Sequence, residues 1–230
     1  MRQEQTARQA LIVLPGLTAD RQKRESMFRF FSENTSYAVY IANIPNRHSL
    51  KVCVKWLDDY LTRVVGPGRF QAVQVLAYIS GGVVLRHMAS SRPIEHLANV
   101  VYVRSPIQEL TMQVLRRRYG RFLLWVLRGR LLLDVAAADL ERLAYPSTLY
   151  GQGLVIETGV SRLARSLGVS AERVPTESWE PDGLLPGADD VIRVPESHDD
   201  VYTSESLLRN ALHFFTHGRF QASETSAVNG

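Results

Sequence analysis

One stretch decides the fold of this chain: Val73-Gln-Val-Leu-Ala-Tyr-Ile-Ser-Gly-Gly-Val-Val-Leu-Arg86. An apolar run rich in β-branched residues meets Ser80, Gly81 and Gly82, and a second apolar run follows them. The first run is typical of a buried strand, and the run after the glycines is typical of a buried helix. The stretch therefore predicts a strand, a sharp turn and a helix, all inside the core.

The rest of the chain repeats this alternation. Strand-like apolar runs lie at 10–14, 37–41, 99–103, 153–157 and 191–195, and helical patterns cover 20–34, 50–65, 160–167 and the segment from 204. Alternation of this kind predicts an α/β fold, with a mostly parallel central sheet of about six strands flanked by helices. With 45% hydrophobic residues, we expect one domain over 1–220. The small, polar segment 221–230 predicts a disordered tail.

Composition limits the classes of function. The lone cysteine, Cys53, cannot form an intrachain disulfide and suits a reducing compartment. The N-terminal residues are polar, and no apolar run reaches the length of a membrane span, so we expect a cytoplasmic protein. Histidines, Cys53 and carboxylates show no metal-ligand spacing, and there is no glycine-rich nucleotide loop. We therefore expect neither a metal nor a cofactor.

The opening stretch resembles the nucleophile elbow of α/β-hydrolases of the lipase and esterase type, which reads small-x-Ser-x-Gly-Gly-x-x-x-Arg. In a first register, Gly81 and Gly82 are the paired glycines and Arg86 is the trailing arginine. Ala77 then takes the small position, and Ile79 falls where the nucleophile belongs. Because isoleucine has no nucleophilic atom, this register implies an elbow that has lost its nucleophile.

A second register makes Ser80 the nucleophile and Gly82 the closing glycine. Tyr78 then falls where the helix backs onto the strand, a place that needs glycine or alanine because a larger side chain collides. The first register satisfies this steric requirement and the trailing arginine, so we favour it. The second remains the alternative.

The resemblance also implies the other parts of a catalytic site. The first strand of the family ends in His-Gly-x, and here Pro15-Gly16-Leu17 stands in that place. The backbone N–H groups of Leu17 and Ser80 would then form the oxyanion hole. His198 follows the last predicted strand, in the position of the catalytic histidine.

The acid of the triad is ambiguous in the sequence. The family pattern Asn-Asp-Gly-x-Val-x-x-Glu-Ser resembles residues 170–178 and places the acid about three residues before Val174. Only Glu172 stands near that place, with a slip in register. Asp182, followed by Gly183, is a competing candidate.

Residues 105–145 correspond to the segment where such hydrolases insert a helical cap. This segment is rich in arginine, aromatic and aliphatic residues, including Arg116, Arg117, Arg118 and Arg121. A basic amphipathic helix with aromatic residues binds an anionic membrane surface or an acidic protein partner, unless its arginines are simply solvated. No nucleic-acid-binding motif is present, so we expect no nucleic-acid partner.

Two functions follow from these assignments. The first is an α/β-hydrolase-fold protein, similar to lipases and esterases, that has lost serine-hydrolase activity and binds a lipid-like or acyl ligand or a protein partner. The second is an active carboxylic-ester hydrolase, with Ser80 as nucleophile, His198 as base and Asp182 or Glu172 as acid. Ile79 separates them, because an apolar residue at the elbow cannot form an acyl-enzyme.

Overall fold

The computed structural model of the chain describes residues 9–17, 19–135, 150–174 and 179–221, with the backbone alone at 121–124 and 126–128. The predicted disordered tail lies outside these residues except for Gln221. The predicted cap, 105–145, is described as far as Val135.

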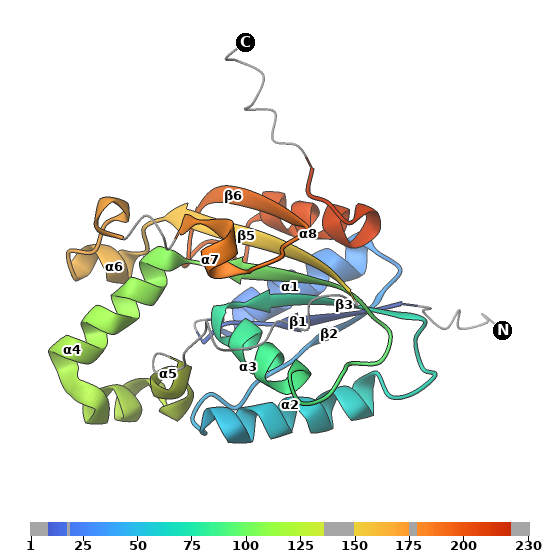
Figure 1. Cartoon of the computed structure of the whole chain (residues 1–230), viewed down its shortest axis with the longest axis horizontal. Coiled ribbons are helices and arrows are strands. Elements are labelled where there is room, and N and C mark those ends of the chain that lie inside the picture. Colours follow the sequence, from blue (N-terminus) through green and yellow to red (C-terminus); the bar gives the residue numbers. More distant parts are fainter. Residues whose placement is uncertain (1–8, 18, 136–149, 175–178, 222–230) are drawn as a thin grey trace, which may run out of the picture.

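Six parallel strands form one sheet in the order β2-β1-β3-β4-β5-β6 (Figure 1). This sheet confirms the predicted α/β class and the number of strands. The strands are β1 (Gln9–Leu14), β2 (Ala38–Ile41), β3 (Ala72–Tyr78), β4 (Leu97–Arg104), β5 (Gly151–Gly159) and β6 (Asp190–Ser197).

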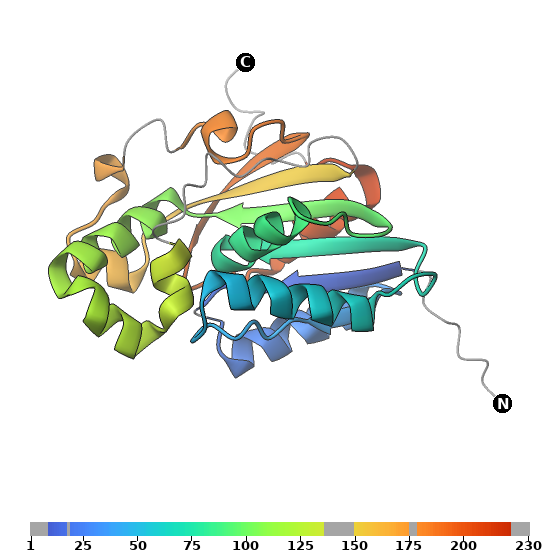
Figure 2. The ribbon, with the colours of Figure 1, turned by 60° about the horizontal axis from the view of Figure 1, so that its bottom comes forward.

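The central strands are buried on both faces, which is why they appear in the sequence as continuous apolar runs. Their side chains alternate between two clusters of the core. In β1, Ile12 and Leu14 belong to one cluster, whereas Leu11 and Val13 belong to the other. The first face is covered by α2 (Leu50–Val64), α3 (Ile79–Ala89) and α5 (Arg130–Val135), and the second by α1 (Arg21–Asn34) and α8 (Glu205–His217) (Figures 1 and 2).

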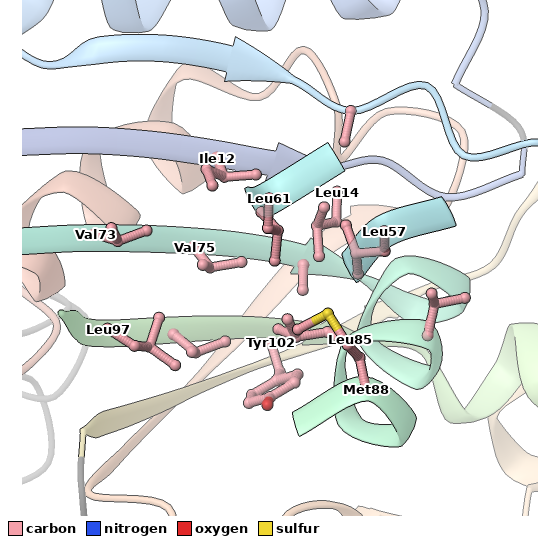
Figure 3. Packing of buried hydrophobic residues seen from close by; sticks show 14 of the residues in the cluster. Ile12, Leu14, Leu57, Leu61, Val73, Val75, Leu85, Met88, Leu97 and Tyr102 are labelled. Carbon is pink, nitrogen blue, oxygen red and sulfur yellow. The ribbon is translucent and has the colours of Figure 1, made fainter. Parts of the chain in front are cut away.

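Figure 3 shows the packing on the first face. Leu57 and Leu61 of α2 and Leu85 and Met88 of α3 lie over the strands. Leu57 and Leu85 are fully or almost fully buried, and each such side chain stabilises the fold by about 2 kcal/mol. The strand residues beneath these helices include Ile12, Leu14, Val73, Val75, Leu97 and Tyr102.

Polar residues set the ends of the two helices on the second face. Asp20 caps α1 by accepting a hydrogen bond from the backbone N–H of Lys23 at 2.9 Å. Ser204 caps α8 by accepting from the backbone N–H of Leu207 at 3.2 Å, and Gly218 ends this helix with φ of 70°. These caps explain why both helices begin where the sequence predicts.

Helices α4 (Pro106–Arg128) and α5 follow β4, and in both views α4 stands away from the sheet at one end of the molecule (Figures 1 and 2). Gly120, with φ of 71° and ψ of 164°, interrupts α4. The base of α5 is tied to the loop after β2, because the backbone N–H of Leu131 donates to the carbonyl of Asn46 at 3.2 Å. Asp134 reinforces this attachment by accepting from the backbone N–H of Leu50 at 2.9 Å.

In its described residues, the connection from β5 to β6 carries the short helices α6 (Arg162–Ser166), η2 (Ala171–Arg173) and α7 (Pro181–Leu184). Within the described parts of the chain, no helix has both the length and the apolar character needed to cross a membrane.

Candidate functional site

The joint between β3 and α3 is unstrained. Tyr78 is extended, with φ of −84° and ψ of 158°, and the helix begins at the next residue, Ile79. A nucleophile elbow instead holds its central residue on a strained turn. Across the described residues, His96 is the one non-glycine residue with a positive φ, so Ile79 carries no such strain. The sharp turn expected from Ser80 to Gly82 is therefore wrong, because these residues lie inside α3.

The two glycines of α3 allow the helix to approach the sheet closely. A Cβ on Gly81 would collide with the backbone oxygen of Leu14, at the end of β1. A Cβ on Gly82 would lie 3.2 Å from the ring of Tyr102 and 3.9 Å from the Cβ of Ala77. Ala77 therefore belongs to the strand face that meets the helix, as the small position of the elbow requires.

Tyr78 points to the opposite face of the sheet. Its ring packs against the ring of Tyr202, with centroids 4.5 Å apart. The side chain therefore does not stand between β3 and α3, where the second register would place it. These contacts favour the first register, in which Ile79 occupies the nucleophile position and Ser80 is buried one residue further on.

A buried histidine and carboxylate form the polar centre of the site. His198 follows β6, and its Nδ1 lies 3.2 Å and 3.4 Å from the two carboxylate oxygens of Glu157. Glu157 lies on β5 and is fully buried. A carboxylate at Nδ1 fixes the orientation of the imidazole and leaves Nε2 as the basic atom, as in a catalytic triad.

The sequence reasoning missed Glu157. Its candidates, Glu172 on η2 and Asp182 on α7, are both exposed, and the carboxylate on His198 Nδ1 comes from β5 instead. One signal was available: a charged residue closes the apolar run 153–157 on β5, the strand before β6. Burying a carboxylate in a sheet interior requires a partner, and this requirement points to a histidine nearby.

Tyr202 occupies the far side of His198. Its hydroxyl lies 3.5 Å from His198 Nε2, and the side chain is fully buried. A Cβ on Gly16 would collide with the same hydroxyl. The phenol therefore lies between the histidine and the turn after β1, beside Leu17, whose N–H is the predicted oxyanion donor.

Tyr78 adds a second buried phenol. Its hydroxyl has no hydrogen-bond partner in the described structure, and the side chain is fully buried. Burial raises the pKa of Tyr78 well above its ordinary value, and the neighbouring Tyr202 and Glu157 raise it further. This phenol therefore stays neutral at physiological pH.

A small hollow lies beside Ile79 in the described part of the chain. The described residues enclose a hollow of about 10 Å³ there, lined by Ile79, Arg86, Arg104, Leu184 and Leu185 among others. That volume holds about one water molecule. Ligand pockets typically measure about 300 Å³ or more, so the hollow, as the described residues enclose it, is smaller than a ligand pocket.

The described part of the cap exposes basic and aromatic side chains. Arg117, Arg118 and Tyr119 are exposed, and Arg116 is partly buried. The guanidinium of Arg118 lies 5.7 Å from the centre of the Tyr119 ring, at cation–π distance. The side chain of Arg121 lies outside the described residues.

In the residues that the structure describes, no group of three or more histidine, cysteine or acidic side chains is placed to hold a metal ion. The ionisable side chains at the site centre are His198 and Glu157 together with the phenols of Tyr78 and Tyr202. This set of side chains can orient a histidine and transfer protons.

The six-stranded parallel sheet with helices on both faces is the architecture of the α/β-hydrolase fold. Solved structures agree. The α/β-hydrolase MGS-MChE2, from the metagenome of lagoon sediments at Mar Chica, matches with a TM-score of 0.56 and 16% identity over 89% of each chain.

The bromoperoxidase from Bacillus anthracis matches with a TM-score of 0.54 and 11% identity over 92% of each chain. The Vlm2 thioesterase domain matches with a TM-score of 0.52 and 11% identity, over 92% of this chain and 94% of that domain. No protein-family model matches the sequence, and no curated protein matches it. At these identities the likeness shows the fold alone.

Proposed function

We propose that this α/β-hydrolase-fold protein lacks serine-hydrolase activity and acts by binding a partner at its outer surface. The observation that carries the proposal is the contact between the Tyr202 hydroxyl and His198 Nε2 at 3.5 Å. In a serine hydrolase, that nitrogen activates a hydroxyl that is open to substrate. Here it faces a phenol with no exposed surface.

Two further features support the proposal. Ile79 at the nucleophile position cannot form an acyl-enzyme. The hollow that the described residues enclose beside it measures about 10 Å³, the volume of about one water molecule. A partner on the outer surface therefore fits the described residues better than a lipid-like ligand held inside the site.

In a protein without hydrolase activity, the pair of Glu157 and His198 has a structural role. The carboxylate is fully buried, and a buried carboxylate needs a hydrogen-bond partner. His198 supplies this partner and joins the end of β5 to the segment after β6. The pair thus stabilises the carboxyl-terminal ends of the strands, where an active relative would carry out catalysis.

The same pair is the observation that favours the second candidate, a carboxylic-ester hydrolase. A carboxylate 3.2 Å from Nδ1 is the arrangement that orients a catalytic base. Ser80 would be the nucleophile and Glu157 the acid. This activity requires Tyr202 to leave Nε2 and Ser80 to reach it.

A fluorophosphonate probe separates the two candidates, because it labels serines that a base has activated. The purified protein is incubated with the probe beside its Ser80→Ala and His198→Ala variants and a working serine hydrolase as positive control. We expect no labelling of the folded protein, with folding checked by circular dichroism. Labelling that disappears in both variants would establish the hydrolase instead.

A further inference from the structure

We propose that the outer part of helix α4 docks on an anionic membrane surface. The residues concerned are named the arginine tip: Arg116, Arg117, Arg118, Tyr119 and Trp125. The proposal goes beyond the loss of hydrolase activity and does not depend on it.

Charge is the first argument. Between Glu109 and Asp134 the sequence has no acidic residue but has six arginines, at positions 116, 117, 118, 121, 128 and 130. The whole chain has 27 basic and 23 acidic residues, so without these six the balance would be 21 to 23. The net positive charge of the protein therefore comes from this one segment, as expected of a surface that binds an anionic partner.

Exposure is the second argument. Arg117 and Arg118 are exposed, and so are Tyr119, at 44%, and Trp125, at 48%. Tyr119 and Trp125 are two of the four large apolar side chains that the described residues expose; the others, Phe28 and Val52, lie on α1 and α2. Tyrosine and tryptophan are the side chains that favour the boundary between water and lipid.

The shape of the cap is the third argument. In both views α4 stands away from the sheet and changes direction in its second half (Figures 1 and 2). The change occurs at Gly120, between Tyr119 and Trp125, and no atom lies within 4 Å of the place where its Cβ would be. A protruding end of this kind reaches a flat surface before the body of the protein does.

A lipid surface fits these features better than a protein does. A protein partner presents charges of both signs at fixed positions, and a surface complementary to it also carries charges of both signs. The segment between Glu109 and Asp134 carries one sign only, which suits a fluid surface of uniform negative charge. Arginines together with aromatic residues are the composition of interfacial helices.

Sedimentation with vesicles tests the proposal. The full-length protein is mixed with vesicles of phosphatidylcholine alone or of equimolar phosphatidylcholine and phosphatidylserine, at low and at high salt. We expect binding to the anionic vesicles only, weakened by salt. The Arg117→Ala/Arg118→Ala variant should bind about 30-fold more weakly, since each arginine near the surface strengthens binding about fivefold.

A matched control removes the same charge elsewhere. Arg29 on α1 and Arg63 on α2 are both exposed. We expect the Arg29→Ala/Arg63→Ala variant to bind the anionic vesicles within about twofold of the unmodified protein, because its charges lie outside the arginine tip. Equal weakening of both double variants would show non-specific attraction and overturn the proposal.

Tryptophan fluorescence supplies a readout of position. The chain has three tryptophans, and Trp56 and Trp179 are partly buried whereas Trp125 is exposed. We expect anionic vesicles to shift the emission to shorter wavelength, and the Trp125→Phe variant to lose this shift. Absence of vesicle binding, or tight binding to polyglutamate without vesicle binding, would overturn the proposal, and the second result would assign the surface to an acidic protein.

Discussion

The hydroxyl oxygen of Tyr202 lies 3.5 Å from Nε2 of His198, with both side chains buried. The phenol fits because Gly16 has no Cβ, which would collide with it. A residue of the chain itself thus takes up the side of the imidazole that an active hydrolase leaves for its nucleophile.

The first prediction concerns Ile79. We expect the Ile79→Ser variant to remain unlabelled by a fluorophosphonate, because Nε2 of His198 already faces Tyr202 and because residue 79 is helical. Gel fluorescence of the folded variant measures this. Strong labelling of the single variant would show that the nucleophile alone is missing, and Ile79→Ser/Tyr202→Ala tests the contribution of the phenol.

The second prediction concerns the buried pair. Glu157→Gln should lower the free energy of unfolding by about 1–3 kcal/mol, because His198 loses a charged hydrogen-bond partner. Urea denaturation measures the change, and a double-mutant cycle with His198→Gln measures the coupling. The exposed Glu172→Gln variant is the control and should change stability by less than about 0.5 kcal/mol. Equal effects at both positions would argue against a structural pair.

The third prediction concerns the hydroxyl of Tyr78. Tyr78→Phe should raise the free energy of unfolding by about 1 kcal/mol, because the variant no longer buries a hydroxyl without a partner. Thermal or urea denaturation measures this. Tyr119→Phe, at an exposed position, is the control and should have little effect. A large loss of stability in Tyr78→Phe would mean that the hydroxyl makes a favourable contact.

The pH dependence of the same variant follows from the raised pKa of Tyr78. The ordinary pKa of tyrosine is 10.0, and in the folded protein that of Tyr78 is higher. As the pH rises, the unfolded chain therefore loses this proton first. Titration of Tyr78 leaves the free energy of unfolding unchanged below pH 10 and lowers it as the pH rises above 10. Urea unfolding curves between neutral and alkaline pH should show that the free energy of unfolding falls less steeply with pH in Tyr78→Phe than in the unmodified protein.

The fourth prediction concerns the close approach of α3 to β1. Gly81→Ala should destabilise the protein by about 1–3 kcal/mol, because the new Cβ collides with the backbone oxygen of Leu14. Gly82→Ala should cost less, since its Cβ would meet a ring carbon of Tyr102 at 3.2 Å. If both variants were more stable, the higher helix propensity of alanine would outweigh the contacts.

The fold was predictable from the sequence because its signals are local. Apolar runs such as 10–14 give strands, and Asp20 and Ser204 fix where helices begin. The small residue at Ala77 was a local signal for the strand face that meets α3. The helical backbone at Ile79 was not predictable in this way, because it depends on how α3 packs on β1 and β4.

The centre of the site was harder to predict because its contacts are long-range. Glu157 and His198 are 41 residues apart, and the sequence pattern around Val174 predicts Glu172 as the acid instead. Nothing in the spacing of Tyr202 after His198 distinguishes an exposed turn residue from a buried one. Only the folded sheet brings Gly16 and Tyr202 together, so this contact has no sequence motif.

The two glycines of the cap differ in one respect that governs how the cap would move. Gly120 has open space where its Cβ would be, whereas a Cβ on Gly129 would lie 2.6 Å from the carbonyl oxygen of Asn46. The chain thus packs closely against the loop after β2 at Gly129 and has open space for bending at Gly120. A force on the outer end of α4 would bend the helix there without pulling α5 from the core, so contact at that end would leave the sheet and its buried phenols undisturbed.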